Sequence, residues 1–308
     1  MKKKKAGKKP KKGNDNLKLL YLFVGAVLLL GAALYIFTTE DKGSTISGSP
    51  HKKSSDKEAT VPASAQPAAT QAMPARPVVQ GERLSLTLSL PKLAIIIDDI
   101  GFNESYIDLI NISVPLTLAV IPHTEYAVSA ALAGSEAGLE IMMHLPMEPK
   151  GYPEADPGKW ALLTNMKEEE ILKNVNANFA RLPDVMGVNN HMGSRFTEYA
   201  EGMKVVLEEV KKRGLFFVDS RTSYRSRAYS IAREMGIKSA ERSIFLDNVQ
   251  TKSAISQQMA KAVKAAKEKG KAIAIGHPSK ATILTLAEIA PHLIDEGVEL
   301  VFASAIVD

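Results

Sequence analysis

Short apolar runs recur through the last two thirds of the chain, and this pattern constrains the fold more than any other feature. There are eight such runs: Leu93–Ile97, Leu116–Ile121, Leu139–Met143, Val185–Val188, Leu215–Val218, Ile244–Leu246, Ala272–Ile275 and Leu300–Ala303. Amphipathic stretches with helical periodicity separate most of them: Lys167–Arg181, Glu198–Arg213, Ser253–Lys269 and Ala281–Glu296. C-cap glycines are expected just after helices, and four fit this position: Gly214, Gly236, Gly270 and Gly297. Strands that alternate with helices predict parallel β/α units.

The number of units narrows the architecture within the α/β class. Seven or eight units in about 215 residues fit a compact or incomplete (β/α)7-8 barrel. A doubly wound open sheet is the main alternative for the same units.

The positive charge of the chain is concentrated in its first residues. Residues 1–18 hold nine lysines and one acid, Asp15, which gives this tail a local charge of +8. The whole chain carries +5, so a charge of −3 remains for everything after the tail. Because the basicity lies in a tail and not on a folded face, we do not expect a nucleic-acid partner. No protein partner is indicated.

A long apolar segment follows the basic tail. Residues 19–37 contain neither charge nor proline, and as a helix they would span about 28 Å, close to the thickness of the hydrocarbon core of a bilayer. Tyr21 and Tyr35 lie near its ends, where aromatic side chains favour the membrane interface. We therefore predict a single-pass signal anchor in the cytoplasmic (inner) membrane. The lysine tail would be cytoplasmic, and the C-terminal domain would lie in the periplasm or outside. A cleaved signal peptide is the alternative.

A segment of different composition joins the predicted anchor to the domain. Residues 38–90 are rich in Ser, Ala, Pro, Thr and Gln and lack apolar periodicity, which predicts a disordered linker. Leu84–Leu90 alternates apolar and polar residues and is a candidate extra edge strand. The folded domain is predicted to occupy residues 91–308.

Polar residues able to bind metals or carry protons gather where the predicted strands end. Functional side chains of parallel β/α folds project from the C-terminal ends of their strands. Eight residues occupy such positions: Asp98, Asp99, His123, His144, His191, Asp219, Asp247 and His277. They include four of the five histidines of the domain, which predicts a shared site.

The residue types indicate the chemistry of this site. The chain has no cysteine, so two or three imidazoles and one carboxylate would bind the metal, a set that suits Zn²⁺ or another divalent ion with an open position. A second carboxylate could act as general base, and a further histidine could protonate the leaving group. Neighbouring residues of a strand face opposite sides, so Asp98 and Asp99 are expected to take different roles. The alternative is that this pair only caps the following helix.

Five segments, taken in order, resemble one known family. The segments AIIIDDIGF, MMHLPMEP, GVNNHMGSRFT, FVDSRTS and AIGHP are similar to motifs of the divergent polysaccharide deacetylases, relatives of the NodB-type carbohydrate deacetylases. The resemblance covers about residues 91–308. It implies a distorted NodB-type barrel that hydrolyses N- or O-acetyl groups of a glycan with the help of a metal.

The resemblance also implies roles for individual residues. Asp98 resembles the general base, Asp99 the carboxylate metal ligand, His144 the first histidine ligand, and His277 the histidine that protonates the leaving group. A cation is expected to hold Asp98 ionised. The candidates for it are Arg195 and Arg221.

The chain departs from the NodB pattern at one position. NodB-type enzymes carry His-x-x-x-His on the third strand, whereas this chain has His144 followed by Glu148. We predict that His191 supplies the missing imidazole, because it lies at the end of the neighbouring strand. The departure also motivates a second hypothesis, in which the domain is catalytically inactive and acts as a glycan-binding or envelope-scaffold module.

The remaining candidates each have a structural alternative. His123 is expected to be structural or to lie at the rim of the cleft. Asp219 and Asp247 could orient a histidine or cap a helix. Trp160 and Tyr152 could form an aromatic platform for a sugar ring or could simply pack.

Overall fold

The computed structural model describes residues 89–182 and 184–308. The predicted basic tail, membrane anchor and nearly all of the predicted linker therefore lie outside the described residues. Ser89 and Leu90, the described end of the predicted edge strand, are not in a strand. No helix among the described residues is both long and apolar enough to cross a membrane.

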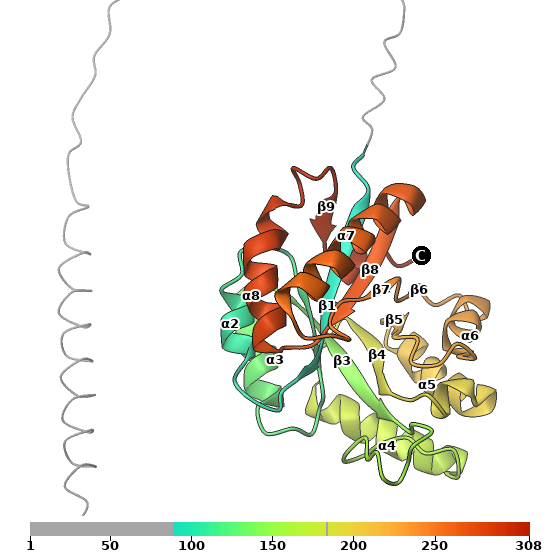
Figure 1. Ribbon diagram of the computed structural model, residues 1–308. Helices are drawn as coiled ribbons and strands as arrows, with labels where there is room; N and C mark the ends of the chain where they lie inside the picture. Colours follow the sequence, from blue (N-terminus) through green and yellow to red (C-terminus); the bar gives the residue numbers. More distant parts are fainter. Residues whose placement is uncertain (1–88, 183) are drawn as a thin grey trace, which may run out of the picture. The chain divides into compact units, whose positions relative to one another are not determined.

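The domain is built on one parallel sheet (Figure 1). Its strands among the described residues are β1 (Lys92–Ile100), β2 (Thr117–Val120), β3 (Glu140–Met147), β4 (Gly187–Met192), β5 (Phe216–Asp219), β6 (Ser239–Glu241), β7 (Ile244–Phe245), β8 (Lys271–Gly276) and β9 (Glu299–Val301). They follow the order β6-β5-β4-β3-β2-β1-β8-β7, and β9 also pairs with β1. All of these pairs are parallel.

This strand order is that of a barrel that does not close completely. Each strand from β1 to β6 lies beside its neighbour in the sequence, and β1 also lies beside β8. The sheet curls round on itself, because side chains of β5 and β8 share one small core although four strands lie between them in this order. The ring is open between β6 and β7, which do not pair with each other. The prediction of an incomplete barrel is confirmed in this form, and the doubly wound alternative is wrong.

Helices cover the outer face of the sheet. In the described part of the chain they are α2 (Tyr106–Ile110), α3 (Ala127–Glu136), α4 (Glu168–Arg181), α5 (Ala200–Lys212), α6 (Ala228–Glu234), α7 (Lys252–Lys269) and α8 (Lys280–Ile289), with 3-10 turns η1 (Phe196–Glu198), η2 (Ala290–His292) and η3 (Ala303–Ala305). The last predicted helix is shorter than expected. Pro291 lies in η2, where a ring without an N–H cannot continue α8.

The sheet separates two hydrophobic cores. Ile95 and Ile97 of β1 face the helices and belong to the larger, outer core. Ala94 and Ile96, one residue out of phase, belong to a smaller core inside the curled sheet. Ala303 and Ile306 from the C-terminal segment also pack into this inner core. The alternation of β1 therefore decides which of its side chains reach the interior.

Candidate metal centre

Polar side chains lie at the open end of the curled sheet, where they follow the inward-facing core residues along each strand. Asp98, His144 and His277 each follow an inner-core residue by two positions. Those core residues are Ile96, Met142 and Ile275. Period-two alternation thus carries three site residues from three separate strands to the same end of the interior.

Asp99 reaches the same site by breaking that alternation. Its φ is 59°, and the pairing of β1 with β2 shifts register between Ile97 and Ile100. Asp99 Oδ1 lies 3.2 Å from His144 Nε2, and Asp98 Oδ2 lies 3.7 Å from the same nitrogen. The expectation that the two carboxylates face opposite sides is wrong, because the left-handed backbone and the irregular register bring both to one imidazole.

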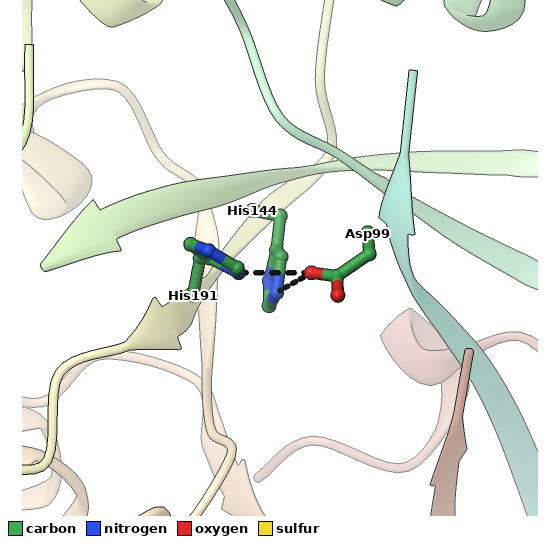
Figure 2. A group of neighbouring side chains, drawn as sticks. All are labelled: Asp99, His144 and His191. Carbon is green, nitrogen blue, oxygen red and sulfur yellow. Dashed lines mark ion pairs between the residues drawn. The ribbon is translucent and has the colours of Figure 1, made fainter. Parts of the chain in front are cut away.

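The three residues predicted as metal ligands lie together. Figure 2 shows the rings of His144 and His191 directed at one carboxylate oxygen of Asp99. His191 Nδ1 is 2.8 Å from Asp99 Oδ1, and one ligand atom from each residue lies within 4.8 Å of the others. They come from β1, β3 and β4, and Pro146 of β3 is the register partner of His191.

This donor set fits a divalent metal ion. Asp99 Oδ1 is buried and has no hydrogen bond of acceptable geometry, although two imidazole nitrogens face it. Two nitrogens and one carboxylate oxygen are ligands that Zn²⁺ and similar ions accept, with further positions open to substrate and water. Burial opposes ionisation of Asp99, but His144 and His191 together lower the pKa of its carboxyl well below the usual range.

Asp98 is held by an amide and not by an arginine. Asn189 Nδ2 donates to Asp98 Oδ1 over 2.7 Å, and Asn189 Oδ1 lies 2.7 Å from His144 Nδ1. Burial raises the pKa of Asp98, and the imidazole of His144 and the amide of Asn189 offset this only in part. Asn189 was not among the predicted site residues. Its spacing, two residues before His191 on one strand, was the available indication.

The two arginines expected beside Asp98 bind elsewhere. Arg195 Nη1 donates to Glu148 Oε1 over 2.8 Å, and Arg221 Nε lies 3.5 Å from Glu241 Oε2. Both pair with other carboxylates, Glu148 just after β3 and Glu241 at the end of β6, so the prediction that one of them pairs with Asp98 is wrong.

Glu148, which occupies the place of the second NodB histidine, is not directed at the ligands. Its Oε2 accepts hydrogen bonds from the Thr164 N–H over 2.5 Å and from the Thr164 hydroxyl over 2.7 Å. Burial alone would raise the pKa of Glu148, but Thr164 and Arg195 lower it below the ordinary glutamate value. The residue fastens the β3 loop to the β4 loop.

His277 is oriented by Asp247, one of the two roles expected of that aspartate. Asp247 Oδ1 is 3.0 Å from His277 Nδ1, and Asp247 Oδ2 accepts from the His277 backbone N–H over 2.6 Å and from the Thr282 hydroxyl over 2.8 Å. Burial lowers the pKa of His277, but Asp247 and the charges of Asp98 and Asp99 together raise it to about 9. Its Nε2 lies 3.7 Å from Asp99 Oδ2, so this ring forms another side of the site.

The other candidates have structural contacts. Asp219 accepts from the Arg221 N–H, the Ser226 hydroxyl and the Tyr229 N–H, so it orders the chain before α6. The His123 ring lies 6.0 Å from the ring of Trp160, which in turn is 5.9 Å from the ammonium of Lys173. These contacts favour the packing interpretation of Trp160.

Comparisons with known proteins agree with the fold and the motifs. The model of the divergent polysaccharide deacetylase family matches residues 95–307. Uncharacterized protein YibQ of Escherichia coli K12 is 33% identical over 232 residues, which cover 72% of this chain and 70% of that protein. An uncharacterized protein of Haemophilus influenzae Rd is 34% identical over 204 residues, which cover 66% of this chain and 72% of that protein.

A solved structure extends the likeness to three dimensions. The crystal structure of an uncharacterized protein from Agrobacterium tumefaciens C58 superposes with a TM-score of 0.69 at 24% identity, covering 71% of this chain and 90% of that chain. At this identity the superposition establishes the fold alone. The matched family model and the two sequence relatives together lead to one conclusion: the chain belongs to the divergent polysaccharide deacetylase family.

Proposed function

We propose that the domain is a metal-dependent hydrolase that removes acetyl groups from a carbohydrate of the cell envelope. The observation that carries this proposal is the convergence of Asp99, His144 and His191 on one point, with a separate carboxylate and a separate imidazole beside them. Family membership supports the same reaction class. When bound, a divalent metal, for which Zn²⁺ is our first choice, would supply Lewis-acid polarisation of the acetyl carbonyl.

Asp98 has the properties of the general base. Its Oδ1 is occupied by the hydrogen bond from Asn189, so Oδ2 is the atom that faces the site. Burial raises the pKa of Asp98, which strengthens its affinity for a proton taken from an attacking water. A carboxylate that is buried yet directed at the ligand cluster is suited to proton transfer more than to capping a helix.

His277 has the properties of the general acid. The raised pKa, about 9, keeps the imidazole protonated at neutral pH. Asp247 fixes Nδ1, so Nε2 is the nitrogen that faces the carboxylates. A protonated Nε2 at this place can donate to the departing sugar amine or hydroxyl.

Acetate release from acetylated oligosaccharides by the zinc-loaded protein tests the proposal. The Asp98→Asn variant should lose at least 100-fold in rate, because an amide cannot accept the proton. Asp295→Asn is the matched control, since Asp295 is exposed and lies 3.8 Å from His292, far along the chain from the site. Equal rates for wild type and Asp98→Asn would exclude Asp98 as the base.

Zinc titration of Asp99→Ala and His191→Ala tests the ligand assignment separately from activity. Each variant should bind zinc more weakly than the wild type, because a three-residue site loses one donor. His292→Ala is the control, because His292 is an exposed histidine. Unchanged stoichiometric binding in both site variants would refute the assignment.

The position of Glu148 favours a second candidate, a domain that binds glycan without hydrolysing it. Because Glu148 faces Thr164 and Arg195, the β3 loop contributes no second imidazole. If this candidate is right, the purified protein will bind acetylated oligosaccharide without releasing acetate, and Asp98→Asn will leave its cellular role intact.

We also propose that the domain works on the outer side of the cytoplasmic membrane. The support comes from the sequence, in which a lysine tail and an uncharged stretch at residues 19–37 precede the domain. A glycan of the cell envelope would be accessible from that side.

A further inference from the structure

One fully buried amide connects the two halves of the site. Asn189 has no exposed surface and is the register partner of His144 on the neighbouring strand. Its two polar ends reach different residues at the same distance: Oδ1 lies 2.7 Å from His144 Nδ1, and Nδ2 lies 2.7 Å from Asp98 Oδ1. A single side chain therefore touches both the proposed base and a proposed metal ligand.

The chemistry of the contacts allows one orientation of this amide. An ionised carboxylate oxygen only accepts hydrogen bonds, so the NH₂ group of Asn189 must face Asp98 Oδ1. The carbonyl oxygen must then face His144 Nδ1, and that nitrogen must carry a hydrogen. A neutral imidazole protonated on Nδ1 has its lone pair on Nε2, the nitrogen that faces Asp98 and Asp99.

We propose that Asn189 is a positioning residue that selects the Nδ1–H form of His144 and fixes Asp98 with Oδ2 directed into the site. One polar side chain thus sets both the donor atom of a ligand and the acceptor atom of the base. The part that concerns Asp98 rests on the function proposed above. The part that concerns His144 depends only on metal binding.

The two histidine ligands are then expected to bind the metal through different ring nitrogens. His144 offers Nε2 because Asn189 accepts from its Nδ1–H. His191 offers Nδ1, the nitrogen that lies 2.8 Å from Asp99 Oδ1. A zinc-loaded protein should therefore use Nε2 of one ring and Nδ1 of the other.

Asn190 provides a matched control on the same strand. Its side chain points the other way: Nδ2 donates to the Met192 carbonyl over 2.8 Å, and Oδ1 accepts from the Ser220 N–H over 2.9 Å. It is as buried as Asn189 and has no hydrogen bond to either Asp98 or His144. A substitution here changes the amide chemistry of β4 without changing the proposed bridge.

The first experiment needs no variant. Long-range ¹H–¹⁵N NMR of the zinc-loaded wild-type protein reports which nitrogen of each histidine carries a proton. We expect His144 to keep its proton on Nδ1 and His191 to keep its proton on Nε2. A proton on Nε2 of His144 would overturn the proposal, whether or not the protein releases acetate.

The second experiment separates the two ends of the amide. Asn189→Leu has a similar volume and lacks both contacts, and it should weaken zinc binding by about 10- to 100-fold, the usual effect of removing a partner that orients a ligand. Asn189→Asp keeps an acceptor for His144 Nδ1–H but replaces the donor to Asp98. It should bind zinc within a few-fold of wild type and release acetate far more slowly.

Two controls make these results decisive. Asn190→Asp carries the same chemical change on the other face of β4 and should leave zinc affinity and the His144 proton position unchanged. Wild-type zinc affinity and an unchanged His144 ring spectrum in Asn189→Leu would contradict the proposal. Wild-type protein that binds zinc but releases no acetate would instead refute the deacetylase function, and the NMR result would still decide the role of Asn189 toward His144.

Discussion

Two neighbouring carboxylates in this site have pKa values shifted in opposite directions, because burial and the nearby imidazoles are balanced differently at each. Asp98 is buried, and its burial outweighs the charge of His144 and the hydrogen bond from Asn189, so its pKa is raised. Asp99 faces two imidazoles, which outweigh its burial and lower its pKa. Adjacent aspartates in the sequence thus become one group that takes up protons and one that stays ionised to bind a cation.

The contact between Asp247 and His277 leads to a prediction about pH. His277 must be protonated to act as an acid, so activity should fall as pH rises through its pKa, which lies near 9. Asp247→Asn removes one of the charges that raise this pKa, so the falling limb of the rate profile should move to lower pH. Rates of acetate release between about pH 6 and pH 10 measure the shift. A falling limb at the same pH in both proteins would contradict the assignment of His277 as the acid.

The buried contacts of Glu148 lead to a prediction about stability. Glu148→Gln should destabilise the domain at pH 7 by about 1–3 kcal/mol, because an amide NH₂ must face either Thr164 or Arg195, both donors. The folded-state pKa of Glu148 is lowered, so its contribution is present above the unfolded value of about 4.3 and is lost as pH falls through the folded value.

Urea unfolding at pH 7 and at about pH 3 measures this dependence. The gap between wild type and Glu148→Gln should narrow at the lower pH. Glu154→Gln, at an exposed position of the same loop, is the control and should change stability little. A gap that stays constant with pH would show that the charge of Glu148 is not what stabilises the loop.

Strands and helices differed in how far the sequence predicted them. Long apolar runs and long amphipathic stretches predicted β1, β3, β8, α4, α5 and α7 within a few residues. The strand β6 was not predicted, because its residues, Ser239–Glu241, contain no apolar run, and pairing with β5 alone makes it a strand. The helices α2 and α3 were also missed, since the five residues of α2 are too few to show a helical period and α3 consists largely of alanine and other small residues. The helix α6 was indicated only by the glycine that follows it, Gly236.

In the candidate site, the sequence pattern identified which residues take part but not how their side chains are directed. Asp98, Asp99, His144, His191 and His277 were found because strand ends of a parallel sheet meet at one edge. The direction of Asp99 was not predictable, because it depends on a positive φ that an aspartate adopts only where its surroundings impose it. The partners of the two arginines depend on where the loops place Arg195 and Arg221, which alternation along a strand does not determine.

The loop that follows β1 leads to a prediction about an element of the fold. Gly101 has a φ of 114°, and a Cβ there would overlap the Thr124 hydroxyl and lie 3.2 Å from the Ala127 Cα. Gly138 also has a positive φ, 78°, but a Cβ there would meet nothing within 4 Å. Gly138→Ala should therefore lose only about 1–2 kcal/mol, the cost of left-handed backbone for alanine. Gly101→Ala should lose roughly 1–3 kcal/mol more.

Thermal or urea unfolding of the two variants measures this difference. Zinc affinity should also fall in Gly101→Ala, because the loop begins two residues after Asp99, and should be unchanged in Gly138→Ala. Equal stabilities and equal zinc affinities would show that the close approach of Gly101 to Thr124 does not hold the end of β1 in place.

For the whole molecule, the absence of cysteine makes the predicted membrane orientation testable. The chain has no native thiol, so a single introduced cysteine is a unique label. In spheroplasts treated with a membrane-impermeant maleimide, Ser64→Cys in the predicted linker should react. Ala6→Cys in the basic tail should react only after permeabilisation. Loss of the Ala6 label from the mature protein would indicate a cleaved signal peptide. Labelling of the Ala6 variant in intact spheroplasts would contradict the orientation.

The position of β1 in the sheet has a consequence for how the domain folds during its synthesis. β1 is the first strand among the residues that the structure describes, yet it pairs with β8 along Lys92–Ile97 and with β9 along Lys92–Ala94. During synthesis β2 can pair with β1 early, but the other edge of Leu93–Ile97 must stay unpaired until residues beyond position 270 have emerged, and Ala303 and Ile306 arrive later still. Contacts between such distant segments form slowly, and an uncovered apolar strand is prone to aggregate meanwhile. The start of β1 is therefore the segment that a chaperone holding the nascent chain would most need to cover.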